Sequence, residues 1–211
     1  MTRAEGAKER AYAFTKQRVL DATYAGGDLL TEGEVAGALG MSRTPVREAF
    51  LRLEGEGLLR LYPKRGALVV PVSAREVEDV METRALVERF AVAKAIEREA
   101  AVAAAMRDAI ARQEDHEGAG DLDGFVAADR EFHTILVAAA GNQIMLELYD
   151  SLRDRQQRMG IAALRREPRR LGQILDEHRG LTDAIEAGDV EPTLALLDAH
   201  LRGTLVLLRE G

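Results

Sequence analysis

The chain has 211 residues, of which 46% are hydrophobic and 31% charged, enough for a buried core under a well-solvated surface. It contains no cysteine, which excludes a disulfide framework and thiolate chemistry and leaves histidines and carboxylates to hold any metal ion. The polar N-terminal segment and the lack of an apolar run of about 18 residues predict a cytoplasmic protein with no membrane partner.

The net charge of −7 is divided unevenly along the chain. Up to Pro71, Lys and Arg number 11 against 9 Asp and Glu, whereas from Val72 onward they number 18 against 27. An acidic total therefore conceals a mildly basic N-terminal third. Attraction to a polyanion would be a local property of that third.

Three helices are predicted in the N-terminal third. The first covers residues 7–25 and ends at a pair of glycines. Thr31 can cap a second, short helix, because Glu34 follows three residues later as in a capping box. Gly40 ends that helix.

The third helix begins within the sequence GMSRTPVREAF. Ser42 or Thr44 can cap it, and Pro45 suits its first turn, where a missing N–H costs nothing. Apolar residues recur at spacings of four and three, which predicts an inward face made by Val46, Phe50 and Leu53. Two closely spaced glycines end the helix.

Arg43 and Arg47 lie off that apolar face, at the N-terminal end of the third helix. Like charges four residues apart on a helix repel each other by a few tenths of a kcal/mol, so a partner outside the chain is expected to compensate them. An ordinary pair of solvated charges is the alternative interpretation.

A hairpin with a basic tip follows the third helix. The apolar runs LLRLY and ALVVPV flank a turn built from Pro63, Lys64, Arg65 and Gly66. Three helices and a hairpin predict a winged helix-turn-helix, whose recognition helix places its N-terminal residues against base edges in the major groove. Arginine commonly reads guanine there, and a helix N-terminus favours phosphate. Double-stranded DNA is therefore the predicted partner of the arginine pair.

Residues 30–70, LTEGEVAGALGMSRTPVREAFLRLEGEGLLRLYPKRGALVV, resemble the winged-helix domain of GntR-family bacterial transcription regulators. The segments SRTPVREA, EGLL and RGA carry the resemblance. It implies that Arg43, Thr44 and Arg47 contact operator DNA and that Gly66 allows close approach to the minor groove. Gly33 is a departure, because the family usually places a DNA-contacting arginine there. We predict a DNA-binding domain over residues 7–71, with contacts from Arg43, Thr44, Arg47, Lys64, Arg65 and Gly66.

Residues 72–211 read as helices throughout. Ser73 and Glu76 form a second potential capping box. In the first of these helices, Arg84 lies on the face that otherwise carries apolar residues. That face is expected to be buried, and a buried charge needs a partner. Glycines and a proline separate later helices, predicted at about residues 100–114, 121–139, 142–165, 169–187 and 191–208. The fold class is therefore mainly α, a winged helix-turn-helix followed by an all-α antiparallel bundle.

Three of the four histidines lie on or beside the apolar face of different helices, whereas His116 lies in a polar loop and is expected to be solvated. Asp129 precedes the first of the three by four residues and projects from the same side of its helix. A single inward histidine is more often a core residue than a ligand. Three with one carboxylate suit Zn²⁺, Ni²⁺ or a similar ion, which spacing does not choose. The predicted ligands are Asp129, His133, His178 and His200.

The segments DREFHTILVAAAGN, EHRGLTDAIEAGD and LLDAHL resemble the FCD-type ligand-binding domain of the FadR branch of the GntR family. That resemblance implies a buried metal bound by one Asp and three His, which the four residues above match. It also implies an inward arginine that meets a carboxylate ligand, and Arg84 matches it. The resemblance covers about residues 10–208.

Together these patterns predict a homodimeric transcription regulator, with repression expected from the resemblance. A small organic acid at the metal site and at Arg84 would control its affinity for operator DNA. Zinc is the first choice of ion, with nickel or manganese as alternatives. A metal-responsive regulator, in which the ion itself is the effector, is the alternative function. We predict no catalytic residue and no enzyme, because no further acid or base can be placed beside the metal.

Overall fold

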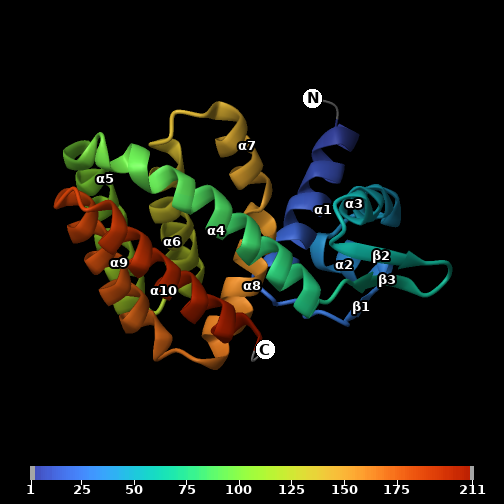
Figure 1. Cartoon of the computed structure of the whole chain (residues 1–211). Helices are drawn as coiled ribbons and strands as arrows, with labels where there is room; N and C mark the ends of the chain where they lie inside the picture. Colours follow the sequence, from blue (N-terminus) through green and yellow to red (C-terminus); the bar gives the residue numbers. More distant parts are fainter. Residues whose placement is uncertain (1–2, 210–211) are drawn as a thin grey trace. The chain divides into compact units, whose positions relative to one another are not determined.

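The computed structural model describes residues 3–209, apart from the side chains of residues 3–5 and 153. The chain divides into two compact units between Val72 and Ser73, and the sequence predicted a division between Pro71 and Val72. Over the described residues the fold is helical with one small sheet, which confirms the predicted class (Figure 1).

The first unit contains three helices and three strands. They are α1 (Arg3–Leu20), β1 (Leu29–Leu30), α2 (Glu32–Leu39), α3 (Arg43–Gly55), β2 (Leu59–Tyr62) and β3 (Gly66–Val69). Helix α1 ends earlier than predicted, because the backbone leaves the helix at Ala22, which has a φ of 56°. The two-residue strand β1 was not predicted, since so short a run shows no alternation of polar and apolar residues.

The caps of α2 and α3 differ in kind. The capping box at Thr31 is formed: its hydroxyl accepts from the Glu34 N–H, and the Glu34 carboxylate accepts from the Thr31 N–H at 2.9 Å. Ser42 precedes α3 in an extended conformation but makes no side-chain cap hydrogen bond, and Thr44 lies inside the helix. Pro45 in the first turn and the tertiary packing therefore define this helix start.

The sheet has the order β1-β3-β2, with both pairs antiparallel. Tyr62 lies opposite Gly66, so the predicted basic turn joins β2 to β3. Gly66 has a φ of 118°, and an added Cβ would lie 2.2 Å from the Leu30 carbonyl oxygen. Glycine is thus required where β3 passes β1. The predicted inward face of α3 is buried in the core of this unit: Val46, Phe50 and Leu53.

The second unit contains seven helices among its described residues. They are α4 (Ala74–Ile96), α5 (Glu99–Ala119), α6 (Leu122–Ala138), α7 (Gln143–Ser151), α8 (Arg153–Arg166), α9 (Arg170–Glu186) and α10 (Val190–Arg209). Helices α4, α10, α9, α5 and α6 form a closed ring, in which each packs on the next, and α8 packs on α6 and α10 (Figure 1). The centre of this ring is enclosed on all sides by helices.

Two predicted boundaries in this unit were wrong, and one predicted capping box is only half formed. The helix expected at 142–165 is divided at Leu152, although no glycine or proline lies at the break and Leu152 has helical dihedrals. Helix α5 continues past residue 114 to Ala119, so His116 lies in its last turn and contacts Asp121 at 2.9 Å. Ser73 caps α4, but the Glu76 carboxylate pairs with arginines of α8 instead of closing the box. Within residues 3–209, no helix combines the length and apolar character needed to cross a bilayer.

Candidate metal centre and candidate nucleic-acid interface

Three histidines meet at the centre of the ring of helices. His133 on α6, His178 on α9 and His200 on α10 are each at most 2% exposed. Their ligand nitrogens all lie within 4.8 Å of one another, and Nε2 of His133 lies 3.2 Å from Nε2 of His200. The three side chains are far apart in the sequence, and packing of the ring brings them together.

Each histidine has an oxygen partner at Nδ1 on another residue. The pairs are His133 with Glu88 Oε2 at 2.8 Å, His178 with Gln113 Oε1 at 2.8 Å and His200 with Glu177 Oε2 at 2.7 Å. A carboxylate or amide oxygen only accepts, so Nδ1 of His178 and of His200 carries the hydrogen. The contact between His133 and Glu88 is close but lacks hydrogen-bond geometry. Nε2 of His178 and of His200 then presents a lone pair to the point at which the three Nε2 atoms converge, as the ligands of a metal ion do.

Burial favours the neutral form of two of the three histidines. Burial lowers the pKa of His178 well below its ordinary value, and the neighbouring His200 and His133 lower it further. Burial also lowers the pKa of His200, although its hydrogen bond to Glu177 opposes the change. Neutral imidazoles are the form that binds metals. Nε2 of His178 is buried with no hydrogen-bond partner among the described residues, which is costly unless a ligand occupies the site.

Asp129 lies at the edge of the histidine cluster. Its Oδ1 is 3.6 Å from Nε2 of His178, and its side chain is a quarter exposed. It projects from α6 one turn before His133, as the spacing predicted. The structure therefore brings three of the predicted metal ligands, the buried imidazoles, into one donor set that could hold a metal ion, and it places the partly open carboxylate of Asp129 beside them.

Arg84 of α4 faces the same centre and is buried. Its Nε donates to Glu88 Oε1 at 2.8 Å, and the Tyr149 hydroxyl donates to the same oxygen at 2.8 Å. Burial alone would raise the pKa of Glu88, but Arg84 and His133 outweigh it and hold the pKa below its ordinary value. Nη2 of Arg84 is buried without a hydrogen-bond partner among the described residues. The Nε side of the guanidinium is thus paired with Glu88, and Nη2 remains available to donate a hydrogen bond.

Sequence reasoning missed the residues that orient the histidines. Glu88 could have been found, because it follows Arg84 by four residues and so lies on the same face of α4. Glu177 adjoins a predicted ligand, and Arg170 holds it through two hydrogen bonds of 2.6 and 2.9 Å. Nothing in the sequence marks Gln113, whose role depends on how α5 packs beside α9.

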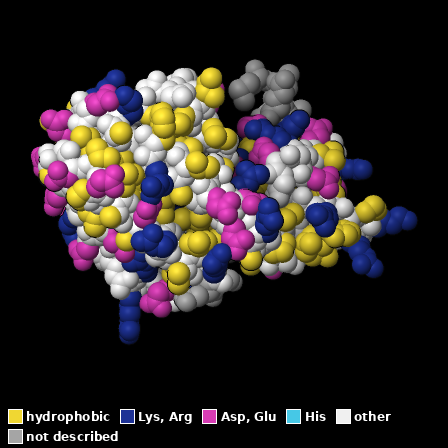
Figure 2. Space-filling model, viewed as in Figure 1, with side chains coloured by type: hydrophobic (Ala, Val, Ile, Leu, Met, Phe, Trp, Pro, Cys, Tyr) yellow, Lys and Arg dark blue, Asp and Glu magenta, His cyan; other side chains and the backbone are white. Residues whose placement is uncertain are grey.

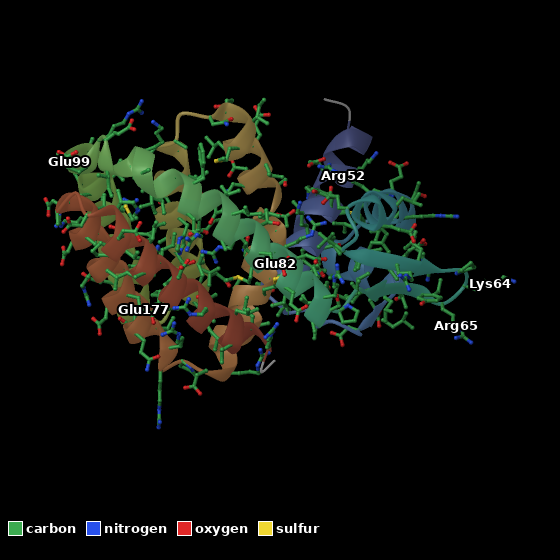
Figure 3. The ribbon with its side chains drawn as sticks, in the orientation of Figure 1. Arg52, Lys64, Arg65, Glu82, Glu99 and Glu177 are labelled. Atoms are coloured by element: carbon green, nitrogen blue, oxygen red, sulfur yellow. The ribbon has the colours of Figure 1, made fainter. Side chains whose placement is uncertain are left out.

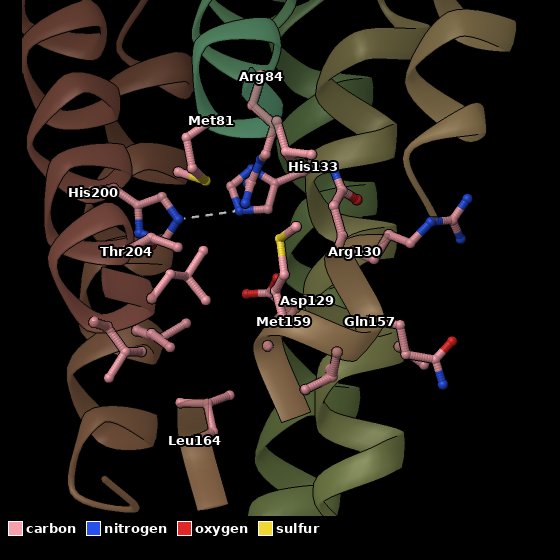
Figure 4. A pocket seen from close by; sticks show the side chains of 18 of the residues that line it. Met81, Arg84, Asp129, Arg130, His133, Gln157, Met159, Leu164, His200 and Thr204 are labelled. Atoms are coloured by element: carbon pink, nitrogen blue, oxygen red, sulfur yellow. Dashed lines mark hydrogen bonds between the residues drawn. The ribbon is translucent and has the colours of Figure 1, made fainter. Parts of the chain in front are cut away.

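A pocket opens beside the cluster and has a cavity volume of about 90 Å³. Arg84, Asp129, His133 and His200 contribute to its wall. Figure 4 shows Arg84, His133 and His200 together at one end, with Leu164 at the other. The pocket lies wholly within the second unit, and of the three histidines His133 and His200 line it.

The predicted DNA-contact residues surround one groove of the first unit, between α3 and the β2–β3 hairpin. Arg43, Arg47, Lys64, Arg65 and Gly66 line it, whereas Thr44 is exposed on α3 beside it. Lys64 and Arg65 project from the hairpin tip (Figure 3), where Figure 2 shows dark-blue side chains standing out from the surface. Four cations from two elements thus face the same open groove.

Within that groove the two arginines of α3 have different surroundings. The side chain of Arg47 is 72% exposed, and its Nε lies 4.0 Å from Glu32. The Arg43 guanidinium lies over Gly33 of α2, where an added Cβ would be 3.4 Å from its Nη2. Gly33 is the position where the family usually has an arginine. The space that a side chain would occupy there is partly filled by the guanidinium of Arg43.

A winged helix with a basic groove, followed by a helical unit around a pocket, is the organisation of a DNA-binding regulator of transcription. The model of the bacterial gntR regulatory protein family matches residues 7–69, and that of the FCD domain matches residues 79–203. The chain belongs to the GntR family of transcription regulators and carries the FCD domain. The matched families regulate transcription rather than catalyse reactions, and GntR regulators bind operator DNA and usually dimerise.

Similar proteins share this organisation. The chain is 33% identical over 197 residues to an uncharacterized HTH-type transcriptional regulator in an unstable DNA locus of Streptomyces ambofaciens, covering 90% of this chain and 80% of that protein. It is 31% identical over 179 residues to the probable D-xylose utilization operon repressor of Paenarthrobacter nicotinovorans, covering 85% and 78%. A GntR regulator structure from Rhodococcus sp. RHA1 superposes with a TM-score of 0.78 at 23% identity, covering 97% and 98%.

Proposed function

We propose that this regulator is a repressor whose operator affinity is controlled by a small carboxylate bound at a metal site in the second unit. The observation that carries the proposal is the convergence of three Nε2 atoms whose rings are fixed through Nδ1. An enclosed site of this kind has no evident use in DNA contact, since it lies within the helical unit. It is suited to sensing.

His133, His178, His200 and Asp129 would hold the metal. Zinc is the first choice, because three imidazoles and one carboxylate are donors that it accepts, with nickel or manganese as alternatives. The bound ion would supply a Lewis-acidic position for carboxylate oxygens. The chain's own part is to fix the donors in place, which Glu88, Gln113 and Glu177 do through Nδ1 of each ring.

Arg84 would be the second anchor of the carboxylate. It lines the pocket, it is buried, and its Nη2 has no partner among the described residues. Nε2 of Gln156, also a pocket residue, is a second buried donor without a described partner. Buried donors left unpaired cost about 1–3 kcal/mol each, so a ligand that brings oxygen acceptors would relieve that cost.

The effector would act by changing the relative positions of the two DNA-binding units of a dimer. A homodimer would place two α3 helices on half-sites about one helical turn apart. A ligand that binds one arrangement better shifts operator affinity by a coupling free energy of typically about 1–3 kcal/mol. Since operators are on the chromosome, the proposal places the protein in the cytoplasm.

Arg47→Ala is expected to weaken operator binding by about 1–3 kcal/mol and to relax specificity at one base pair, because an exposed arginine at this helix start can read a guanine edge. Binding is measured by fluorescence anisotropy on the operator and on single-base variants. Arg10→Ala is the matched control, since Arg10 is exposed on α1 and does not line the groove. An equal loss on every sequence would make Arg47 a phosphate contact instead.

The effector proposal is tested by titrating operator affinity first with metal alone and then with carboxylates on metal-loaded protein. We expect metal alone to leave affinity nearly unchanged and a bound carboxylate to lower it about 5- to 150-fold. If metal alone switches DNA binding across its cellular range, the ion is the effector and the carboxylate proposal fails.

A further inference from the structure

The pocket beside the histidines has two chemically different ends. The polar end holds Arg84, Asp129, His133 and His200. Gln156, Gln157 and Thr204 also line the pocket. Beyond the polar end most of the wall is formed by apolar side chains from four helices: Val126, Met159, Leu164, Ile174, Leu207 and Leu208. In Figure 4, Met159 lies between the histidine end and Leu164. A molecule held at the histidines would therefore extend along an apolar wall.

Within the part of the chain that the structure describes, the end of the pocket away from the histidines offers no charge for a second anionic group. Among the described lining residues the cationic side chains are Arg84 and Arg130, and Arg130 pairs with Asp150 at 2.5 Å. Figure 4 shows Arg130 and Gln157 extending to one side, away from His200. A second carboxylate on the ligand would lie among apolar groups without a free cation, and burying an unpaired charge is strongly unfavourable.

The volume sets the size of the ligand. A water-sized group occupies about 10–15 Å³ of such a cavity, so 90 Å³ holds roughly six to nine non-hydrogen atoms. For a straight-chain acid this corresponds to about four to seven carbons.

We propose that the effector is a monocarboxylic acid with a compact apolar body of about four to seven carbons, its carboxylate at the histidine end and its body against Leu164 and Leu207. The inference rests on the proposed function, in that it takes the same pocket as the effector site. It adds the chemical class of the ligand, which the metal donors alone do not determine.

Isothermal titration of the metal-loaded full-length protein with acetate, butanoate, hexanoate, decanoate and citrate tests this class. Each buried methylene contributes about 0.8 kcal/mol, so affinity should rise about fourfold per methylene up to hexanoate. Decanoate should gain nothing further, and citrate should bind more weakly than hexanoate. A flat dependence on chain length, or tightest binding of citrate, would overturn the inference.

A matched pair of variants on α10 locates the body of the ligand. Leu207→Phe fills part of the apolar end and should weaken hexanoate binding at least tenfold while leaving acetate unchanged. Val206→Phe is the control, because Val206 is 54% exposed and does not line the pocket. Equal hexanoate binding by the two variants would remove Leu207 from the site. The chain-length series uses the unaltered protein, so it decides the proposal even where a variant does not fold.

Failure of the inference differs from failure of the proposed function. If no acid in the series binds, or if bound acids leave operator affinity unchanged, the carboxylate-sensing function is wrong. If acids bind and lower operator affinity but show no preference for an apolar body, the function stands and the ligand class is wrong.

Discussion

His178→Ala is expected to abolish metal retention. The variant removes one of three converging Nε2 donors, and the remaining two imidazoles with Asp129 no longer form a complete donor set. Elemental analysis of purified protein measures metal per chain. A chelator should lower the melting temperature of the wild type but not that of the variant, because a ligand that binds only the folded state stabilises it.

The control for this experiment is His116→Ala. That histidine contacts Asp121 on the surface and lies outside the cluster, so metal content should not change. The ring of His178 also stacks on Phe132 with centroids 3.9 Å apart, and alanine removes that contact. His200→Ala, which keeps the stacking on Phe132, should therefore show the same loss of metal. Full metal content in either variant would remove that residue from the ligand set.

Glu88→Gln is expected to destabilise the second unit by about 3–5 kcal/mol, because it leaves the buried Arg84 without its counter-charge. Glutamine keeps the volume of the side chain, so packing changes little. Arg84 and Glu88 are 7% and 0% exposed, and burial makes the lost charge interaction costly. Chemical denaturation in the presence of a chelator measures the change, and the chelator excludes loss of metal as its cause.

Glu82→Gln is the matched control. Glu82 is exposed on the same helix (Figure 3), and its change should stay within about 0.5 kcal/mol. The double variant Arg84→Met with Glu88→Gln should recover most of the stability, since replacing both members of a buried pair is often nearly neutral. A loss below about 1 kcal/mol in Glu88→Gln would show that the pair is not the main support of Arg84.

Much of the first unit could be predicted because its signals are local. The Thr31 capping box, Pro45 and the apolar spacing of Val46 and Phe50 each act within a few residues, and the structure follows them. Where local signals were absent, prediction failed. The α7–α8 break at Leu152 has no glycine or proline, and β1 exists because β3 lies beside it.

The sequence by itself determined that this chain is a winged helix joined to a helical bundle, and that three histidines and an arginine face inward. Those properties follow from periodicity and caps, which are set by neighbours along the chain. Only the tertiary structure decided that Glu88, Gln113 and Glu177 each lie against Nδ1 of one ring, and that most of the pocket beyond is apolar. Such pairings depend on the rotation and height of five helices in a closed ring, and no local pattern specifies them.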